Sequence, residues 1–296
     1  MRQLKGCVAV AALLSAAACS ALERETATGQ EPGRSPTRQE PTSSGSGRVS
    51  LETADAWDVS ARLGVLTMPA YTGSDDYQLW AVPEVSLRYG EFFFSFFEGT
   101  GYNVLNNGTW RAGPVVKYQF GRDEDGDNPT RIGGRVTDDL RGLGDVDDTL
   151  EVGGFVEYRN GSFVGKLEVR QGLGGHEGVI GGLELKRQQM VNLFGQQGFL
   201  SVGPELTLAD STYNRSYFGV SPAQSASSRL APYDAGDEFL SVGVGVALAL
   251  PLTRRVSLTG LGRYSRLLGN AAESSLVRER GSEDQFMGGL FLSYQF

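Results

Sequence analysis

Val242-Gly-Val-Gly-Val-Ala-Leu-Ala-Leu250 alternates between branched apolar side chains and small ones. A period of two places successive side chains on opposite faces of a β-strand. The same alternation recurs, with polar or small residues between apolar ones, in segments that begin near Trp57, Leu79, Pro114, Phe163, Leu200 and Phe286. Turn-forming residues separate these segments, and none has the period of an amphipathic helix. The pattern therefore predicts an all-β fold.

The composition excludes several classes of protein. The chain has 296 residues, a net charge of -8 and 40% hydrophobic residues, which is too apolar for a wholly disordered protein. Its 41 glycines follow no period of three, so collagen is excluded. No basic cluster is present, and affinity for nucleic acid depends on Lys and Arg that neutralise phosphates. We therefore predict no nucleic-acid partner.

The segments are long for a soluble β-sandwich. They reach the 9 to 11 residues, roughly, that an oblique strand needs to cross a bilayer, whereas strands of soluble sheets usually have about five or six. The last segment alternates from Phe286 to the terminal Phe296, which resembles the C-terminal strand by which bacterial outer-membrane barrels are recognised for insertion. Together with an export signal, this predicts a transmembrane antiparallel β-barrel in the bacterial outer membrane.

The connections between segments indicate the strand number. Long connections at 121–148, 210–238 and 269–284 would lie at one end, and short turns at 160–161 and 251–255 at the other, as in outer-membrane barrels. About 12 strands are predicted, with 10 as the alternative. Twelve strands require residues 91–105 to form two short strands around Gly99.

The face opposite the apolar one would point into the barrel, and it carries charges of both signs. An unpaired buried charge costs several kcal/mol, so these side chains are expected to pair across strands. Paired charges would plug the lumen, whereas a wide lumen would leave a small water-filled channel. The charged residues on this face are Arg62, Glu84, Arg88, Arg111, Lys117, Glu151, Glu157, Arg159, Lys166, Glu168, Arg170, Glu184, Lys186, Glu205 and Arg263.

The first 50 residues differ from the rest. Residues 1–21 have the charged start, short apolar stretch and small residues of an export signal. Cleavage after Ala18 would fit a plain signal, but the following Cys19 also fits a bacterial lipobox and would then be acylated; both alternatives stay open. Residues 22–50 form a polar segment, predicted to be a disordered linker. The predicted barrel comprises residues 51–296.

Six loop motifs resemble the MipA/OmpV family of outer-membrane proteins, which is named for an MltA-interacting protein. They are Tyr71-Thr-Gly-Ser-Asp-Asp-Tyr77, Gly113-Pro114 leading to Phe120-Gly121-Arg122, Gly142-Leu-Gly-Asp-Val-Asp-Asp148, Arg170-Gln-Gly-Leu-Gly-Gly-His-Glu-Gly178, Tyr217-Phe-Gly-Val-Ser-Pro-Ala-Gln-Ser225 and Val277-Arg-Glu-Arg-Gly-Ser-Glu-Asp-Gln-Phe286. In this order they cover the whole predicted barrel. This chain departs from the family pattern of plain exported barrels in the segment from Cys19 to Ser50.

The resemblance implies a structural or scaffolding protein of the cell envelope that links a murein hydrolase and a murein synthase. The alternatives are a small channel or transporter, or an adhesin. Partners expected from this reading are outer-membrane lipid, lipopolysaccharide and the murein enzymes. The motifs carry no binding residues that could be transferred to this chain.

No catalytic, cofactor-binding or metal-binding residue is predicted, and the chain is not expected to be an enzyme. His176 is the single histidine and lies in a glycine-rich loop, where structural hydrogen bonds are the favoured interpretation. The acidic run from Asp123 to Asp127 resembles a calcium loop, but its twelfth position is Gly134 where a bidentate Glu is needed. A divalent cation bridging this loop to lipopolysaccharide phosphates is the alternative to a solvated loop.

Overall fold

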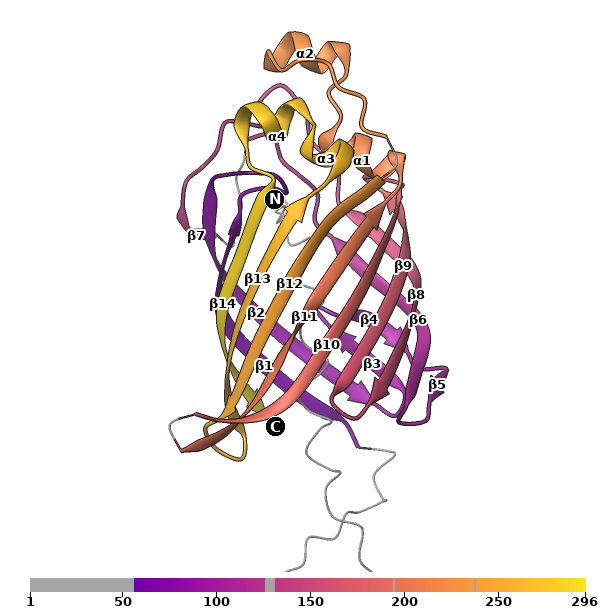
Figure 1. Cartoon of the computed structure of the whole chain (residues 1–296), viewed down its shortest axis with the longest axis vertical. Coiled ribbons are helices and arrows are strands. Elements are labelled where there is room, and N and C mark those ends of the chain that lie inside the picture. Colours follow the sequence, from indigo (N-terminus) through magenta and orange to yellow (C-terminus); the bar gives the residue numbers. More distant parts are fainter. Residues whose placement is uncertain (1–55, 126–130, 194, 237) are drawn as a thin grey trace, which may run out of the picture.

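The computed structural model describes residues 56–125, 131–193, 195–236 and 238–296. These residues form one antiparallel sheet that curls into a barrel (Figure 1). The strands are β1 (Asp58–Pro69), β2 (Tyr77–Tyr89), β3 (Phe92–Ser95), β4 (Gly99–Tyr102), β5 (Leu105–Asn106), β6 (Trp110–Gln119), β7 (Arg131–Gly134), β8 (Thr149–Asn160), β9 (Phe163–Gly174), β10 (Val179–Leu193), β11 (Gln196–Ala209), β12 (Glu238–Pro251), β13 (Val256–Leu267) and β14 (Asp284–Gln295).

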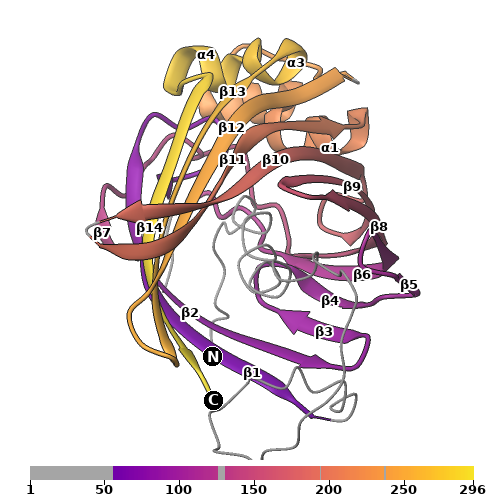
Figure 2. The same cartoon turned by 60° about the horizontal axis from the view of Figure 1, so that its bottom comes forward.

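The barrel closes because β1 pairs with both β2 and β14. Around the ring the order is β1, β14, β13, β12, β11, β10, β9, β8, β6, β4, β3 and β2, and Figure 2 shows this curvature. The ring has 12 strands, which confirms the prediction and excludes the alternative of 10. The two remaining strands lie off the ring, with β5 on β6 and β7 on β2.

The two short strands predicted around Gly99 are β3 and β4, joined by the turn 96–98. Gly99 has φ +89°, and a Cβ there would lie 2.4 Å from the carbonyl oxygen of Val116. Only glycine fits this turn without strain. Because β3 and β4 are only four residues long, they fill the wall between β2 and β6 over part of its height.

The apolar residues predicted to face lipid do point outward. Val242, Val244 and Val246 are each more than 40% exposed, as are Leu290 and Leu292 of the last strand. Aromatic rings pair on this surface near both ends of the barrel, which is the arrangement of a membrane-spanning band. The ring pairs are Trp57–Tyr89, Trp110–Tyr158 and Tyr294–Phe296 at one end, and Tyr118–Phe120 and Tyr264–Phe286 at the other.

Four short helices, which the sequence did not predict, cover the end of the barrel that carries Tyr118 and Phe286 (Figure 1). We call these helices and their loops the cap, and this end of the barrel the capped end. The helices are α1 (Ser211–Phe218), α2 (Pro222–Ser228), α3 (Gly269–Ala272) and α4 (Ser275–Arg280). With eight residues at most, they are too short to show a helical period. Side-chain caps begin α1, α2 and α4, whereas α3 has none. Asp210 accepts from the Tyr213 amide, and Ser221 forms a capping box with Gln224. No helix in the described part of the chain is long and apolar enough to cross a membrane.

Candidate functional site

The lumen contains a network of ion pairs centred on Glu168 of β9. Its carboxylate, about 1% exposed, receives Lys117 from β6 at 2.6 Å and Lys166 at 2.8 Å. Arg170, two residues along the same face, also contacts it. Three cations on one carboxylate compensate for the loss of hydration that a charge suffers inside the barrel. The prediction that lumen charges pair across strands is therefore confirmed.

Further pairs extend this network around the wall. Across strands, Arg111 lies 3.0 Å from Glu157, Arg62 lies 3.0 Å from Glu84, and Arg263 contacts Glu205. Same-face neighbours two residues apart also pair, as in Arg159 with Glu157 and Lys186 with Glu184. A longer contact, at 4.0 Å, joins Arg88 to Glu98 of the β3–β4 turn.

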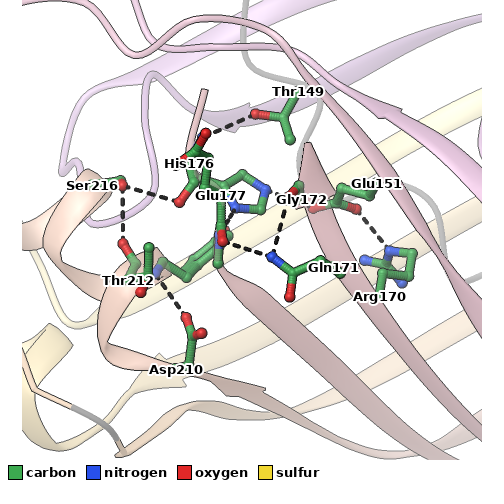
Figure 3. Close-up of polar contacts among 12 residues, drawn as sticks. Thr149, Glu151, Arg170, Gln171, Gly172, His176, Glu177, Asp210, Thr212 and Ser216 are labelled. Carbon is green, nitrogen blue, oxygen red and sulfur yellow. Dashed lines mark hydrogen bonds and ion pairs between the residues drawn. The ribbon is translucent and has the colours of Figure 1, made fainter. Parts of the chain in front are cut away.

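His176 connects this network to the cap (Figure 3). Glu151 accepts from Arg170 Nε at 2.7 Å on one oxygen and lies 3.1 Å from His176 Nε2 on the other. The Gly178 amide donates to His176 Nδ1 at 3.1 Å, so the proton resides on Nε2 and is donated to Glu151. The imidazole is 1% exposed and packs edge-on against Tyr213 of α1.

The neighbouring glycine explains why this loop is glycine-rich. A Cβ on Gly172 would lie 2.3 Å from Cε1 of His176, so any other residue would displace the ring. Both ring nitrogens are thus committed to structural hydrogen bonds. The nearby hydroxyl of Ser216 donates to the His176 carbonyl at 3.5 Å and to the Thr212 carbonyl at 2.9 Å, so it is bonded to the backbone rather than to the imidazole. The arrangement lacks the nucleophile-to-base hydrogen bond of a catalytic site.

Two apolar clusters hold the cap together. One joins α1, α3 and α4 to the barrel rim through Tyr217, Phe218 and Leu267, and the other joins Tyr71, Leu140 and Leu276. Hydrogen bonds from side chains to backbone carbonyls tie the loops to each other. They are Arg122 Nη1 to the Tyr217 carbonyl at 2.6 Å, Ser274 Oγ to the Phe218 carbonyl at 2.6 Å, and Arg280 Nη1 to the Asp139 carbonyl at 2.6 Å.

Tyr71 of the cap has a phenol whose pKa is raised by its surroundings. Its side chain is buried and its hydroxyl donates to the Arg280 carbonyl at 3.0 Å. Burial raises the pKa of the Tyr71 phenol well above its ordinary value, and the negative charges of Asp139 and Asp75 raise it further. The phenol is therefore a neutral hydrogen-bond donor at physiological pH.

A cavity of about 80 Å³ lies between the cap and the network. The cap contributes Tyr71 and Tyr213, and the barrel contributes Arg170, Arg263 and Gln285 to its lining. This volume has room for a few water molecules.

An apolar cluster, which the sequence pattern did not predict, also lies on the lumen wall, beside the Arg62–Glu84 pair. Leu66, Met68, Trp80, Val82, Phe97, Met287 and Phe291 form one buried cluster. These residues come from β1, β2, β14 and the β3–β4 turn. The unbroken apolar run from Leu79 to Pro83 is a signal that both faces of β2 are apolar over this stretch.

Three carboxylates meet at the cap, where no metal ligands were predicted. One oxygen each of Asp75, Asp76 and Asp139 lie within 4.8 Å of one another. Arg135 pairs with Asp76 at 3.3 Å and so offsets part of this charge. The calcium-like run falls partly on residues 126–130, outside the described residues, as does Cys19 with the segment 1–55.

A closed antiparallel barrel with an apolar outer face between two belts of aromatic rings defines a β-barrel of the outer membrane. The family model of the MltA-interacting protein MipA matches residues 62–296. The chain therefore belongs to the MipA family, which confirms the resemblance seen in its loop motifs.

Two curated relatives are named outer membrane proteins. They are Omp26La of Vibrio anguillarum and OmpV of Vibrio cholerae, each 33% identical over 91 residues. The aligned part is 31% of this chain, and the chain spans only 34% of the length of each relative. The predicted location in the bacterial outer membrane is confirmed.

Solved structures with a similar course of the chain are barrels of low sequence identity. The KdgM porin is 8% identical, with a TM-score of 0.36 over 81% of this chain and 99% of that one. The β-domain of the Bordetella autotransporter BrkA is 12% identical, with a TM-score of 0.36 over 82% and 100% of the two chains. Neither likeness bears on function.

Proposed function

We propose that this barrel is a structural or scaffolding protein of the cell envelope rather than an enzyme or an open channel. The observation that carries the proposal is the filled lumen. The ion pairs around Glu168 cross the lumen wall from β6 to β9. The cap covers one end of the barrel and is held there by two apolar clusters. His176 joins the ion pairs to the cap, so a path for solutes would require both to move.

A small channel is the second candidate, and the cavity beneath the cap favours it. Recording from the purified barrel in a planar bilayer separates the two functions. A scaffold with a filled lumen should give no steady conductance steps. Steps that vanish when the lumen is closed by an added disulfide would overturn the scaffold proposal.

The partners we propose are a murein hydrolase and a murein synthase, in keeping with the family description as an MltA-interacting protein. Crosslinking in intact envelopes, followed by recovery of the full-length barrel, should bring down both enzymes. A variant without residues 22–50 tests whether the polar segment or the barrel turns hold them. Recovery of neither enzyme with the full-length protein would contradict the scaffold role.

We propose further that residues 1–21 direct export and that lipid and lipopolysaccharide surround the barrel. Acylation of Cys19 remains one of two proposals for the N-terminus of the exported chain. The intact mass of protein purified from membranes distinguishes them. A mass that includes acyl groups on Cys19 supports the lipoprotein, and a free terminus without lipid excludes it.

A further inference from the structure

The barrel wall is interrupted between β2 and β6. In the described part of the chain, β2 pairs with β3 only over residues 86–89 and with β7 only over residues 78–80. Residues 81–85 of β2 therefore have a strand partner on one side, β1, and residues 117–119 of β6 have only β8. We call the wall between these two stretches the seam. Because an unpaired strand edge is unfavourable in hydrocarbon, the seam needs an occupant or a cover.

A continuous series of aromatic contacts crosses the wall at the seam. Tyr118 lies 5.0 Å from Phe120, Phe120 lies 5.8 Å from Phe96, and Phe96 lies 5.8 Å from Phe97. Phe97 then meets Phe291 inside the barrel, with 5.9 Å between ring centroids. Tyr118 and Phe96 are 53% and 43% exposed on the outer face, whereas Phe97 and Phe291 are buried.

The rings therefore form an apolar path from the lipid-facing surface to the apolar cluster of the lumen. Trp80 and Val82 belong to the same cluster as Phe97. Both lie on the strand that borders the seam. An apolar chain that followed this path would leave one hydrocarbon environment and enter another. The charges at the edges of the seam, Glu84 and Lys117, are already paired with Arg62 and Glu168.

Two unsatisfied hydrogen-bond donors flank the seam. Nε1 of Trp80 on β2 and Nε2 of Gln119 on β6 are buried and have no hydrogen-bond partner. The two side chains are 1% and 7% exposed and occupy lumen-facing positions near the capped ends of their strands. A buried donor without an acceptor is unfavourable, so both donors are suited to the oxygen of a ligand. Because the donors are neutral, a carbonyl oxygen suits them better than a charged headgroup.

We propose that the seam binds one acyl chain of a membrane lipid. The hydrocarbon lies along the aromatic path and its end reaches the lumen cluster of Phe97 and Phe291. The ester or amide carbonyl at the head of the chain accepts from Trp80 or Gln119. A second copy of the barrel paired edge to edge would cover the seam too, but it would leave these two donors unsatisfied.

Photocrosslinking tests whether an acyl chain enters. The full-length barrel is reconstituted in phosphatidylethanolamine vesicles that include a phosphatidylethanolamine with a diazirine near the end of one chain. We expect adducts on lumen-facing residues of the cluster, especially Phe97 and Met287, in addition to adducts on the outer surface. Adducts confined to outward-facing residues, or crosslinked dimers joined through the seam, would overturn the proposal.

Variants test the two donors. Trp80→Phe keeps an aromatic ring and Gln119→Leu keeps the side-chain size, and each removes one donor. We expect each to reduce the lumen adducts severalfold. The matched control is Gln188→Leu, which removes another buried and unpartnered amide donor on β10, away from the seam. Heat-modifiable gel migration verifies that each variant folds. Equal lumen labelling in Gln188→Leu and in both seam variants would show that the donors do not hold the ligand.

Discussion

Two regions of the lumen wall are built from opposite chemistry on one continuous sheet. On β6, β8 and β9 many inward side chains are charged and pair around Glu168. On β1, β2 and β14 an apolar cluster around Trp80 lies beside a single ion pair, Arg62 with Glu84. Strands β6, β8 and β9 pair with one another in a continuous ladder, and the seam lies between this ladder and β2 of the apolar cluster. The two regions differ in what they tolerate, because a buried ion pair needs both partners at fixed positions, whereas apolar packing accepts side chains of similar volume.

The largest effect is expected from breaking the charged region at its centre. Glu168→Gln leaves Lys117, Lys166 and Arg170 without their shared carboxylate, and a buried pair that loses one partner costs about 3 to 5 kcal/mol. The free energy of unfolding in urea, measured in detergent micelles, should fall by this amount. Asp234→Asn, which removes an exposed pair with Arg215, is the control and should cost less than about 1 kcal/mol.

A substitution in the apolar cluster should lower the free energy of unfolding through lost packing alone. Leu66→Ala opens a hole in the cluster with Trp80 and Phe291, and such truncations cost about 2 to 5 kcal/mol. The same urea titration measures the loss. Unlike Glu168→Gln, this variant should show no added dependence on salt, since no charge is uncovered. A strong salt dependence would argue against a purely apolar cluster.

The outer face provides a third contrast because it must stay apolar. Val246→Arg near the middle of β12 should cost about 2 to 4 kcal/mol if the side chain faces lipid. The test is the free energy of unfolding from lipid vesicles. Gly245→Ser, one residue away and on the lumen face, should be tolerated. A larger loss in Gly245→Ser than in Val246→Arg would reverse the assignment of the two faces.

The smallest effect is expected in the cap. Tyr71→Phe removes the hydrogen bond to the Arg280 carbonyl and should lower stability at pH 7 by about 1 kcal/mol. Burial raises the pKa of Tyr71 in the folded protein, so the contribution of this phenol is complete below the unfolded value of about 10 and is lost as pH rises above it.

The wild-type barrel should therefore lose its advantage over Tyr71→Phe above about pH 10. The midpoint of the heat-induced gel shift, measured for both proteins across alkaline pH, checks this. A difference between the two that stays constant with pH would contradict the raised pKa.

The sequence predicts the barrel well because strand alternation is a local signal. It identifies the outward face, the two short strands beside Gly99 and the pairing of lumen charges. It does not predict the apolar cluster, since Leu66 and Trp80 sit next to outward apolar residues and the two faces cannot be told apart by polarity.

The cap and the junction at His176 depend on contacts between distant segments. Helices of four to eight residues leave no periodic pattern, and side-chain caps give a local signal for α1, α2 and α4 but not for α3. The bond between His176 and Glu151 joins residues 25 positions apart, one in the short connection 175–178 and the other on β8. Propensity and spacing do not specify such a contact, because it is fixed only when β8 and β9 are in register.

Closure of the ring by β1 and β14 sets the order in which the chain can assemble. Hairpins such as β8–β9 bring together neighbouring residues, whereas the closing pair joins Asp58 to Gln295, 237 positions apart. The loss of chain entropy for such a contact is large, and folding slows as the mean separation of contacts grows. The hairpins should therefore form first and give an open sheet in which β1 and β14 are not yet paired. During that interval β1 and β14 each present a free edge, which is when a folding helper would matter most and when aggregation would begin.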